Sequence, residues 1–110
     1  MASYLVQVSY APEALSSLIA KPQDRTRHIT KVIEGLGGKL IGSWLAFGDY
    51  DLVMITEMPN NVNAAALSLA AAAGGSLTTI KTTPLLTVAQ GLSALKKAGK
   101  SGYKPIAAAK

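Results

Sequence analysis

The side chains best suited to chemistry gather in one short stretch, the run FGDYD from Phe47 to Asp51. Asp49 and Asp51 are two of only six acidic residues in the chain, and Tyr50 lies between them. Carboxylates and a phenol can hydrogen-bond the polar head of a small ligand. A structural interpretation competes with this one, because aspartate tolerates turn conformations and bonds nearby turn amides. The two interpretations remain open at this point.

Two residues outside this stretch also fit a ligand site. Gln7 is polar within the otherwise apolar run SYLVQVSY, and in a central strand it must find a partner or line a cavity. Trp44 could wall such a cavity, although packing in a core is the default role of a tryptophan. The predicted ligand-binding set is therefore Gln7, Trp44, Gly48, Tyr50 and Asp51.

Catalytic residues stay undetermined, and His28 and Asp51 are the two candidates for a general base. His28 is the single histidine, and its spacing puts it beside the apolar stripe of a helix, where a surface histidine is the more common outcome. The chain has no cysteine, and a lone histidine makes a poor metal site. No phosphate-binding, hydrolase or zinc-protease motif occurs. The sequence predicts no metal site and no cofactor, and it leaves open whether the protein is an enzyme.

Length and composition favour one soluble domain. The chain has 110 residues, of which 49% are hydrophobic, enough for a packed core. The start MASYLVQVSY lacks the pattern of a secretory signal, and the run at residues 62–80 is too polar to span a membrane. We expect a cytoplasmic protein with no membrane partner.

The net charge of +5 is confined to the C-terminal end. Residues 1–95 hold six basic and six acidic side chains, so that part of the chain is formally neutral. The surplus consists of Lys96, Lys97, Lys100, Lys104 and Lys110. Only Tyr103 is available there for base stacking, and no arginine is present, so a solvated tail is favoured over a nucleic-acid-binding one.

The elements that must position the candidate residues follow from the periodicity of apolar side chains. Residues 3–10 alternate as a strand does, and Pro12 fits the first position of a short helical turn. Between residues 22 and 36 the apolar side chains keep helical spacing, and a glycine pair follows, which predicts an amphipathic helix ending near Gly37.

The second half of the chain continues the pattern. Strands are expected at 39–48 and 50–58, joined by a tight turn about Gly48 and Asp49. An alanine-rich helix begins near residue 61, and a β-branched run at 76–83 supplies a fourth strand. After Pro84 a further helix is expected, with Thr87 as its cap.

This order predicts an α+β, ferredoxin-like βαββαβ sandwich, with four antiparallel strands, two helices on one face and an added C-terminal helix. We expect a domain at residues 1–90, followed at 91–110 by the end of the helix and a flexible basic tail. The other sheet face would carry Leu5 and Gln7 or their neighbours, with either Leu52 and Met54 or Val53 and Ile55. An uncovered apolar face predicts a homodimer or a higher homo-oligomer that packs sheet to sheet.

Three segments resemble the GYD domain family: the hairpin AFGDYDLVMITEMP, the preceding IEGLGGKLIGSWLAFG and the closing TTIKTTPLLT. The family takes its name from a glycine–tyrosine–aspartate signature, which corresponds to Gly48, Tyr50 and Asp51. The resemblance covers residues 3–90, and the tail beyond about residue 95 departs from it. It implies a ferredoxin-like, dimeric α/β-barrel fold, and it implies no assigned activity.

The same hairpin, with the later TTIKTT, is more weakly similar to the effector-binding module of leucine-responsive, feast–famine regulators. In those regulators a glycine-bearing hairpin helps to form a small-molecule site between subunits. Together these features predict a homo-oligomeric module that binds a small organic ligand or senses one. Two alternatives stay open: a cofactor-free enzyme of the dimeric α/β-barrel type (a monooxygenase, isomerase or lyase), and a structural assembly subunit.

Overall fold

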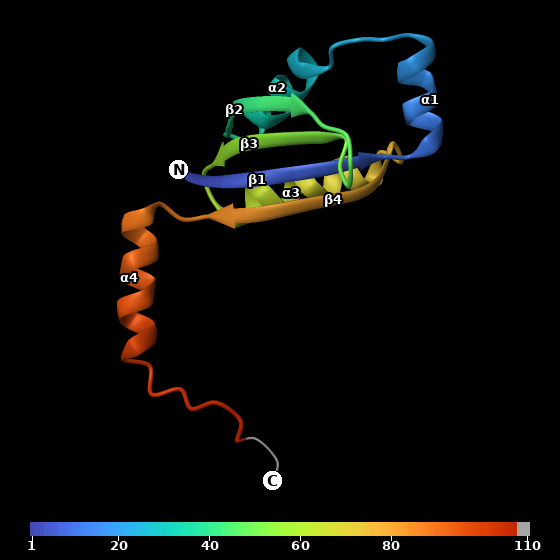
Figure 1. The fold of residues 1–110 in the computed structure, drawn as a ribbon. Helices are drawn as coiled ribbons and strands as arrows, with labels where there is room; N and C mark the ends of the chain where they lie inside the picture. Colours follow the sequence, from blue (N-terminus) through green and yellow to red (C-terminus); the bar gives the residue numbers. More distant parts are fainter. Residues whose placement is uncertain (108–110) are drawn as a thin grey trace.

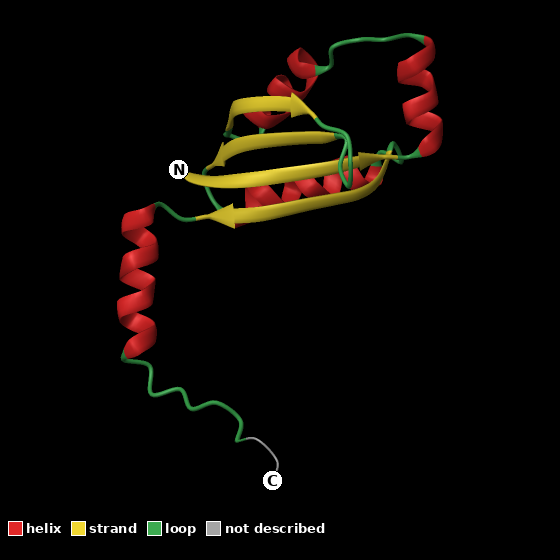
Figure 2. Ribbon diagram, in the orientation of Figure 1, coloured by secondary structure: helices red, strands yellow, loops and turns green. Residues whose placement is uncertain are grey.

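The computed structural model describes residues 1–107, so Lys110 of the basic tail lies outside the described residues. Its elements are β1 (Ala2–Tyr10), α1 (Pro12–Ala20), α2 (Thr26–Gly35), β2 (Lys39–Leu45), β3 (Leu52–Met58), α3 (Asn61–Ala73), β4 (Leu77–Leu85) and α4 (Val88–Gly99). The strands form one antiparallel sheet in the order β2-β3-β1-β4, with α2 and α3 on the same side (Figures 1 and 2). The α+β, ferredoxin-like prediction is confirmed. Within residues 1–107 no helix has the length and apolar character needed to cross a membrane.

The core lies between the sheet and these two helices. Along β1 and β3 every second side chain is buried, as expected where one face of a strand meets a core. Helix α2 contributes Ile33, and α3 contributes Ala64 and Leu67, which pack against Tyr4 and Met58. The small alanine side chains of α3 allow this close approach to the sheet.

The strand register decides which side chains occupy the opposite face. Gln7 pairs with Val53 on one side and with Lys81 on the other, and Trp44 pairs with Val53, so these four form one row across the sheet. In the next row Leu5 pairs with Ile55. Of the two alternatives, Val53 and Ile55 therefore share a face with Leu5 and Gln7. We call this surface, which α2 and α3 leave uncovered, the open face.

The expected tight turn about Gly48 and Asp49 is wrong. The β2–β3 ladder ends at the pair of Leu45 and Leu52, and the intervening residues 46–51 form a wider loop. This loop bonds to β1: the Asp51 amide donates to the Val8 carbonyl at 2.8 Å, and Ser9 Oγ donates to the Asp49 carbonyl at 2.9 Å. The Ala46 amide still donates to the Asp51 carbonyl at 2.8 Å, so the loop closes the hairpin while it also bonds to β1. We call residues 46–51 the GYD loop.

Other boundaries shift for local reasons. Strand β4 runs on to Leu85 through Pro84, which an edge strand tolerates because proline only lacks a donor. The predicted short turn after Pro12 is a helix of nine residues, α1. Thr87 caps α4 as expected, through a capping box with Gln90.

Gly38, which directly precedes β2, shows how closely α2 and β3 are packed. A Cβ on Gly38 would lie 2.6 Å from the Glu57 carbonyl oxygen and would also contact Met58 Sδ. We expect Gly38→Ala to lower the free energy of unfolding by about 1–3 kcal/mol, because backbone must move. Urea denaturation measures this change. The matched control is Gly35→Ala, where a Cβ meets no atom within 4 Å, so this substitution should leave stability unchanged or slightly higher. Equal losses in both variants would contradict this account of the packing.

Candidate functional site

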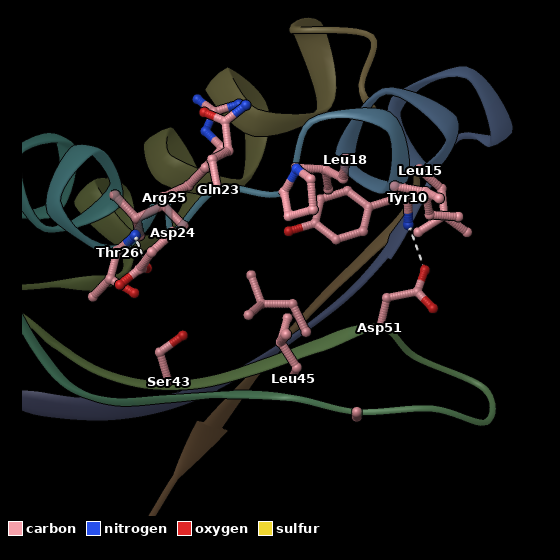
Figure 3. Close-up of a pocket in the computed structure, with 15 residues that line it drawn as sticks. Tyr10, Leu15, Leu18, Gln23, Asp24, Arg25, Thr26, Ser43, Leu45 and Asp51 are labelled. Atoms are coloured by element: carbon pink, nitrogen blue, oxygen red, sulfur yellow. Dashed lines mark hydrogen bonds between the residues drawn. The ribbon is translucent and has the colours of Figure 1, made fainter.

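A cleft of about 680 Å³ opens between α1, the α1–α2 linker, the first turn of α2, the end of β2 and the start of β3 (Figure 3). Its volume lies in the range of small-molecule sites, roughly 300–1,000 Å³. Aliphatic side chains form most of its walls: Leu15, Leu18 and Ile19 from α1, Ile29 from α2, and Leu45 and Leu52 from the sheet. The cleft is open on one side to solvent.

Helix α1 supplies one wall because its apolar residues share a face. Leu15, Leu18 and Ile19 follow helical spacing, and Pro12 starts the helix with a fixed φ suited to its first turn. No residue of α1 is buried, although Leu15 and Ile19 are large and apolar. The apolar face of α1 therefore borders open space where a core helix would have a packed partner.

Tyr10 brings a polar group into this apolar setting. It ends β1, and Figure 3 shows its ring reaching into the cleft above Leu45. Partial burial raises the pKa of the Tyr10 phenol, because the charged phenolate loses solvation. The Arg25 guanidinium acts in the opposite direction on this pKa, and the Asp51 carboxylate adds to the rise. Near neutral pH the hydroxyl is protonated and able to donate a hydrogen bond.

Asp51 holds the end of β1 in place. Its Oδ2 accepts the backbone N–H of Tyr10 at 2.9 Å. The pairing of β1 with β3 ends at Val8, and the pairing with β4 shifts register between Ser9 and Tyr10. The carboxylate thus bonds β1 beyond the point where the β1–β3 ladder stops, and this is the structural role that competed with ligand binding in the sequence. Asp51 also lines the cleft, so the two roles are compatible.

The polar rim of the cleft is formed by the α1–α2 linker. Asp24 Oδ1 accepts the N–H of Thr26, the first residue of α2, at 2.8 Å, and this hydrogen bonding with Thr26 lowers the pKa of Asp24. Figure 3 shows the side chains of Gln23 and Arg25 directed outward from the cleft. The rim is therefore charged while the interior is aliphatic.

The residues selected from the sequence do not form a single site. Asp51 alone lines the cleft. Gln7 and Trp44 share a row on the open face, and the Trp44 ring lies over Gly42. Tyr50 joins this row, since its ring centroid is 5.9 Å from Nζ of Lys81, the partner of Gln7.

Two further observations concern Tyr50 and Gly48. A hydrogen bond to the Tyr50 hydroxyl raises the pKa of Lys81, because it stabilises the charged ammonium. Gly48 has a φ of 139°, in a region that favours glycine, and its Cβ position faces open space. The conformation of the GYD loop is by itself a sufficient reason for a glycine at this position.

His28 is exposed on α2 and is absent from the lining of the cleft, so the two general-base candidates are not brought together. Across residues 1–107 no three histidine, aspartate or glutamate side chains gather where they could hold a metal ion. Sequence reasoning missed Tyr10 and the α1 wall. The available signal was the spacing of Leu15, Leu18 and Ile19 on a helix that had no stated partner.

The family model of the GYD domain matches residues 4–95, most of the chain and all of the sheet apart from the first residues of β1. The chain belongs to the GYD domain family. A search of curated proteins gives no match.

In this GYD domain the signature residues lie at a junction. Asp51 faces the cleft and fixes the end of β1, while its neighbour Tyr50 contacts Lys81 at the row of the open face. The GYD loop therefore connects the cleft on one side of the sheet with the open face on the other.

Two substitutions of charged residues near Tyr10 should change the pKa of its phenol in opposite directions. Asp51→Asn should lower the pKa of Tyr10, because a carboxylate that disfavours the phenolate is removed. Arg25→Gln should raise that pKa, because a cation that stabilises the phenolate is lost. The measurement is the ring Cζ chemical shift of ¹³C-labelled tyrosine through a pH titration, with Tyr10→Phe to assign the signal.

Glu13→Gln is the control, since Glu13 is an acid of α1 that does not influence the Tyr10 pKa. This substitution should leave the pKa of Tyr10 unchanged. If Asp51→Asn and Arg25→Gln shift the pKa in the same direction, the arrangement of charges described for the cleft is wrong.

Proposed function

We propose that this GYD domain is a homo-oligomeric module that binds a small organic ligand in the cleft beside α1. The observation that supports this function is the combination of a cleft of about 680 Å³, aliphatic walls and a single phenol reaching inward. Ligand sites typically combine an apolar lining with few polar groups that fix orientation. Of the five residues selected from the sequence, Asp51 belongs to this site, and we assign Gln7, Trp44, Gly48 and Tyr50 to the open face and its loop.

The lining indicates the class of ligand. Leu15, Leu18 and Leu45 favour a compact apolar body such as an alicyclic or aromatic ring. The Tyr10 hydroxyl is a neutral donor and would bond one carbonyl or hydroxyl oxygen of that ligand. Asp51 already accepts the backbone N–H of Tyr10, so it fixes the backbone that carries the phenol and is less free to contact the ligand itself.

Ligand binding would also complete the packing of α1. In the chain alone Leu15 is 40% exposed and Ile19 is 73% exposed. Complete burial of an exposed leucine or isoleucine stabilises by about 1.5–3 kcal/mol, and a ligand that covers Leu15 and Ile19 gains the share that corresponds to their remaining exposed surface. We therefore expect α1 to become more ordered when the cleft is filled.

The open face would form the interface between copies. Leu5, Val53 and Ile55 are only half-buried there, and Trp44 is 57% exposed. Packing two such sheets face to face buries these apolar rows, which is the usual way for a sheet to cover an apolar surface. Because Tyr50 and Asp51 are adjacent, a ligand that moves Tyr10 or Asp51 would also displace Tyr50 at this interface, as a sensor requires.

A screen of small ring compounds tests the proposed site. The panel consists of monocyclic ketones and phenols with ten or fewer heavy atoms, with binding detected by ligand-observed NMR and dissociation constants measured by calorimetry. Tyr10→Phe should weaken a bound ketone about fivefold to tenfold, the effect of losing one neutral hydrogen bond worth about 1 kcal/mol. Leu18→Trp should abolish binding by filling the cleft.

Each variant has a matched control elsewhere on the surface. Tyr103→Phe removes a hydroxyl from an exposed tyrosine, and Leu69→Trp enlarges an exposed leucine of α3; both should leave affinity unchanged. The proposal fails if no compound binds, or if Leu18→Trp binds as tightly as the unaltered chain.

A further inference from the structure

Helix α4 stands apart from the rest of the chain (Figure 1). It has 12 residues and a complete capping box, yet none of its residues is buried. Val88, Leu92 and Leu95 form one apolar stripe, with exposed fractions of 83%, 53% and 70%. An isolated helix of this length is marginal in water, so a partner surface must contribute to its stability.

The dimensions of the chain also indicate missing contacts. Its radius of gyration is 17.9 Å, whereas a compact chain of this length has about 13 Å. Its accessible surface is 8083 Å², against about 5,800 Å² for a compact monomer of 11.4 kDa. The excess, about 2,300 Å², exceeds the roughly 800 Å² that one partner contributes to a standard interface. The exposed residues 100–107 after α4 account for part of this excess, and the exposed α4 and the open face contribute to the rest.

A second unpartnered apolar surface lies at the opposite edge of the sheet. In the strand order β2-β3-β1-β4, α4 follows one edge strand and β2 is the other. On β2, Ile41 is 52% exposed and Trp44 is 57% exposed. Figure 1 shows α4 extending away from the sheet on the β4 side, so within one chain the two surfaces are apart.

Two-fold symmetry brings these surfaces together. Leu85, which ends β4, shares a cross-strand row with Ser3, Glu57 and Lys39, the first residue of β2. If two open faces pack about an axis parallel to the strands, the rotation reverses the order of the strands but keeps their direction. The end of β4 in one copy then lies opposite the start of β2 in the other. An axis across the strands would instead set β4 against β4 and leave Ile41 without cover.

We infer that α4 is exchanged between two copies of this chain, its stripe of Val88, Leu92 and Leu95 packing on the β2 edge of the second copy against Ile41 and Trp44. This inference rests on the homodimer of the proposed function. It adds a second contact between the two copies, next to the contact between their open faces. Pairing of α4 with α4 is less favourable, because no acidic residue follows Glu57 and the lysines of both helices would add to one another.

Cysteine cross-linking in the full chain tests the exchange, since the natural sequence contains no cysteine. Ile41→Cys and Leu92→Cys are made as separate variants, mixed under conditions that allow subunits to exchange, and oxidised. A disulfide requires Cα atoms within about 7 Å, so only direct packing gives a linked dimer on a non-reducing gel. We expect most of the mixed dimer to be linked.

The control replaces Leu92→Cys with Ser93→Cys, on the other side of α4. Its yield with Ile41→Cys should be at least tenfold lower. A high yield of linked dimer from Leu92→Cys alone would mean that α4 pairs with α4 and would overturn the inference. Equal yields from positions 92 and 93, or none from position 92, would overturn it as well.

Solution mass separates failure of the exchange from failure of the dimer. The chain has a mass of 11.4 kDa, and sedimentation equilibrium of the unaltered protein should give twice that value. A dimer without the Ile41–Leu92 cross-link contradicts the exchange alone. A monomer contradicts the dimer and the exchange together, while the cleft remains testable by ligand titration.

Discussion

The sheet has two faces rich in apolar side chains, and the helices that pack on it cover only one of them. On the covered face Tyr4, Val6 and Val8 of β1 meet α2 and α3 and form the core. On the open face the same strand presents Leu5 and Gln7 to solvent. Water disfavours an apolar surface of this extent, and the proposed association of two copies follows from that cost.

The GYD loop connects the open face of the sheet with the cleft. It closes the β2–β3 hairpin and also bonds to the last residues of β1, so Asp51 fixes the end of this central strand beyond the last β1–β3 pair. Tyr10 is thereby positioned in the cleft, and Tyr50 is positioned beside Lys81 on the opposite side. The adjacent residues Tyr50 and Asp51 of the family signature thus lie at two different surfaces, the open face and the cleft.

Local patterns in the sequence were sufficient for much of the fold. The alternation in residues 3–10, the stripe of α2 and the Thr87 cap depend on near neighbours, so strands, helices and the ferredoxin-like order could be predicted. The face of β3 could not, because Leu52 with Met54 and Val53 with Ile55 are both apolar sets. The GYD loop was missed because its bonds reach β1, some forty residues earlier. The cleft was missed because α1 and the sheet form it only in three dimensions.

Fluorescence of Trp44 tests the central claim, that a second copy covers the open face, because this is the only tryptophan and it is 57% exposed in a single chain. Its emission and its quenching by acrylamide are followed as the protein is diluted. We predict a blue-shifted, protected tryptophan at high protein concentration that becomes red-shifted and readily quenched as the dimer dissociates. A tryptophan that is fully accessible at every concentration would contradict the claim.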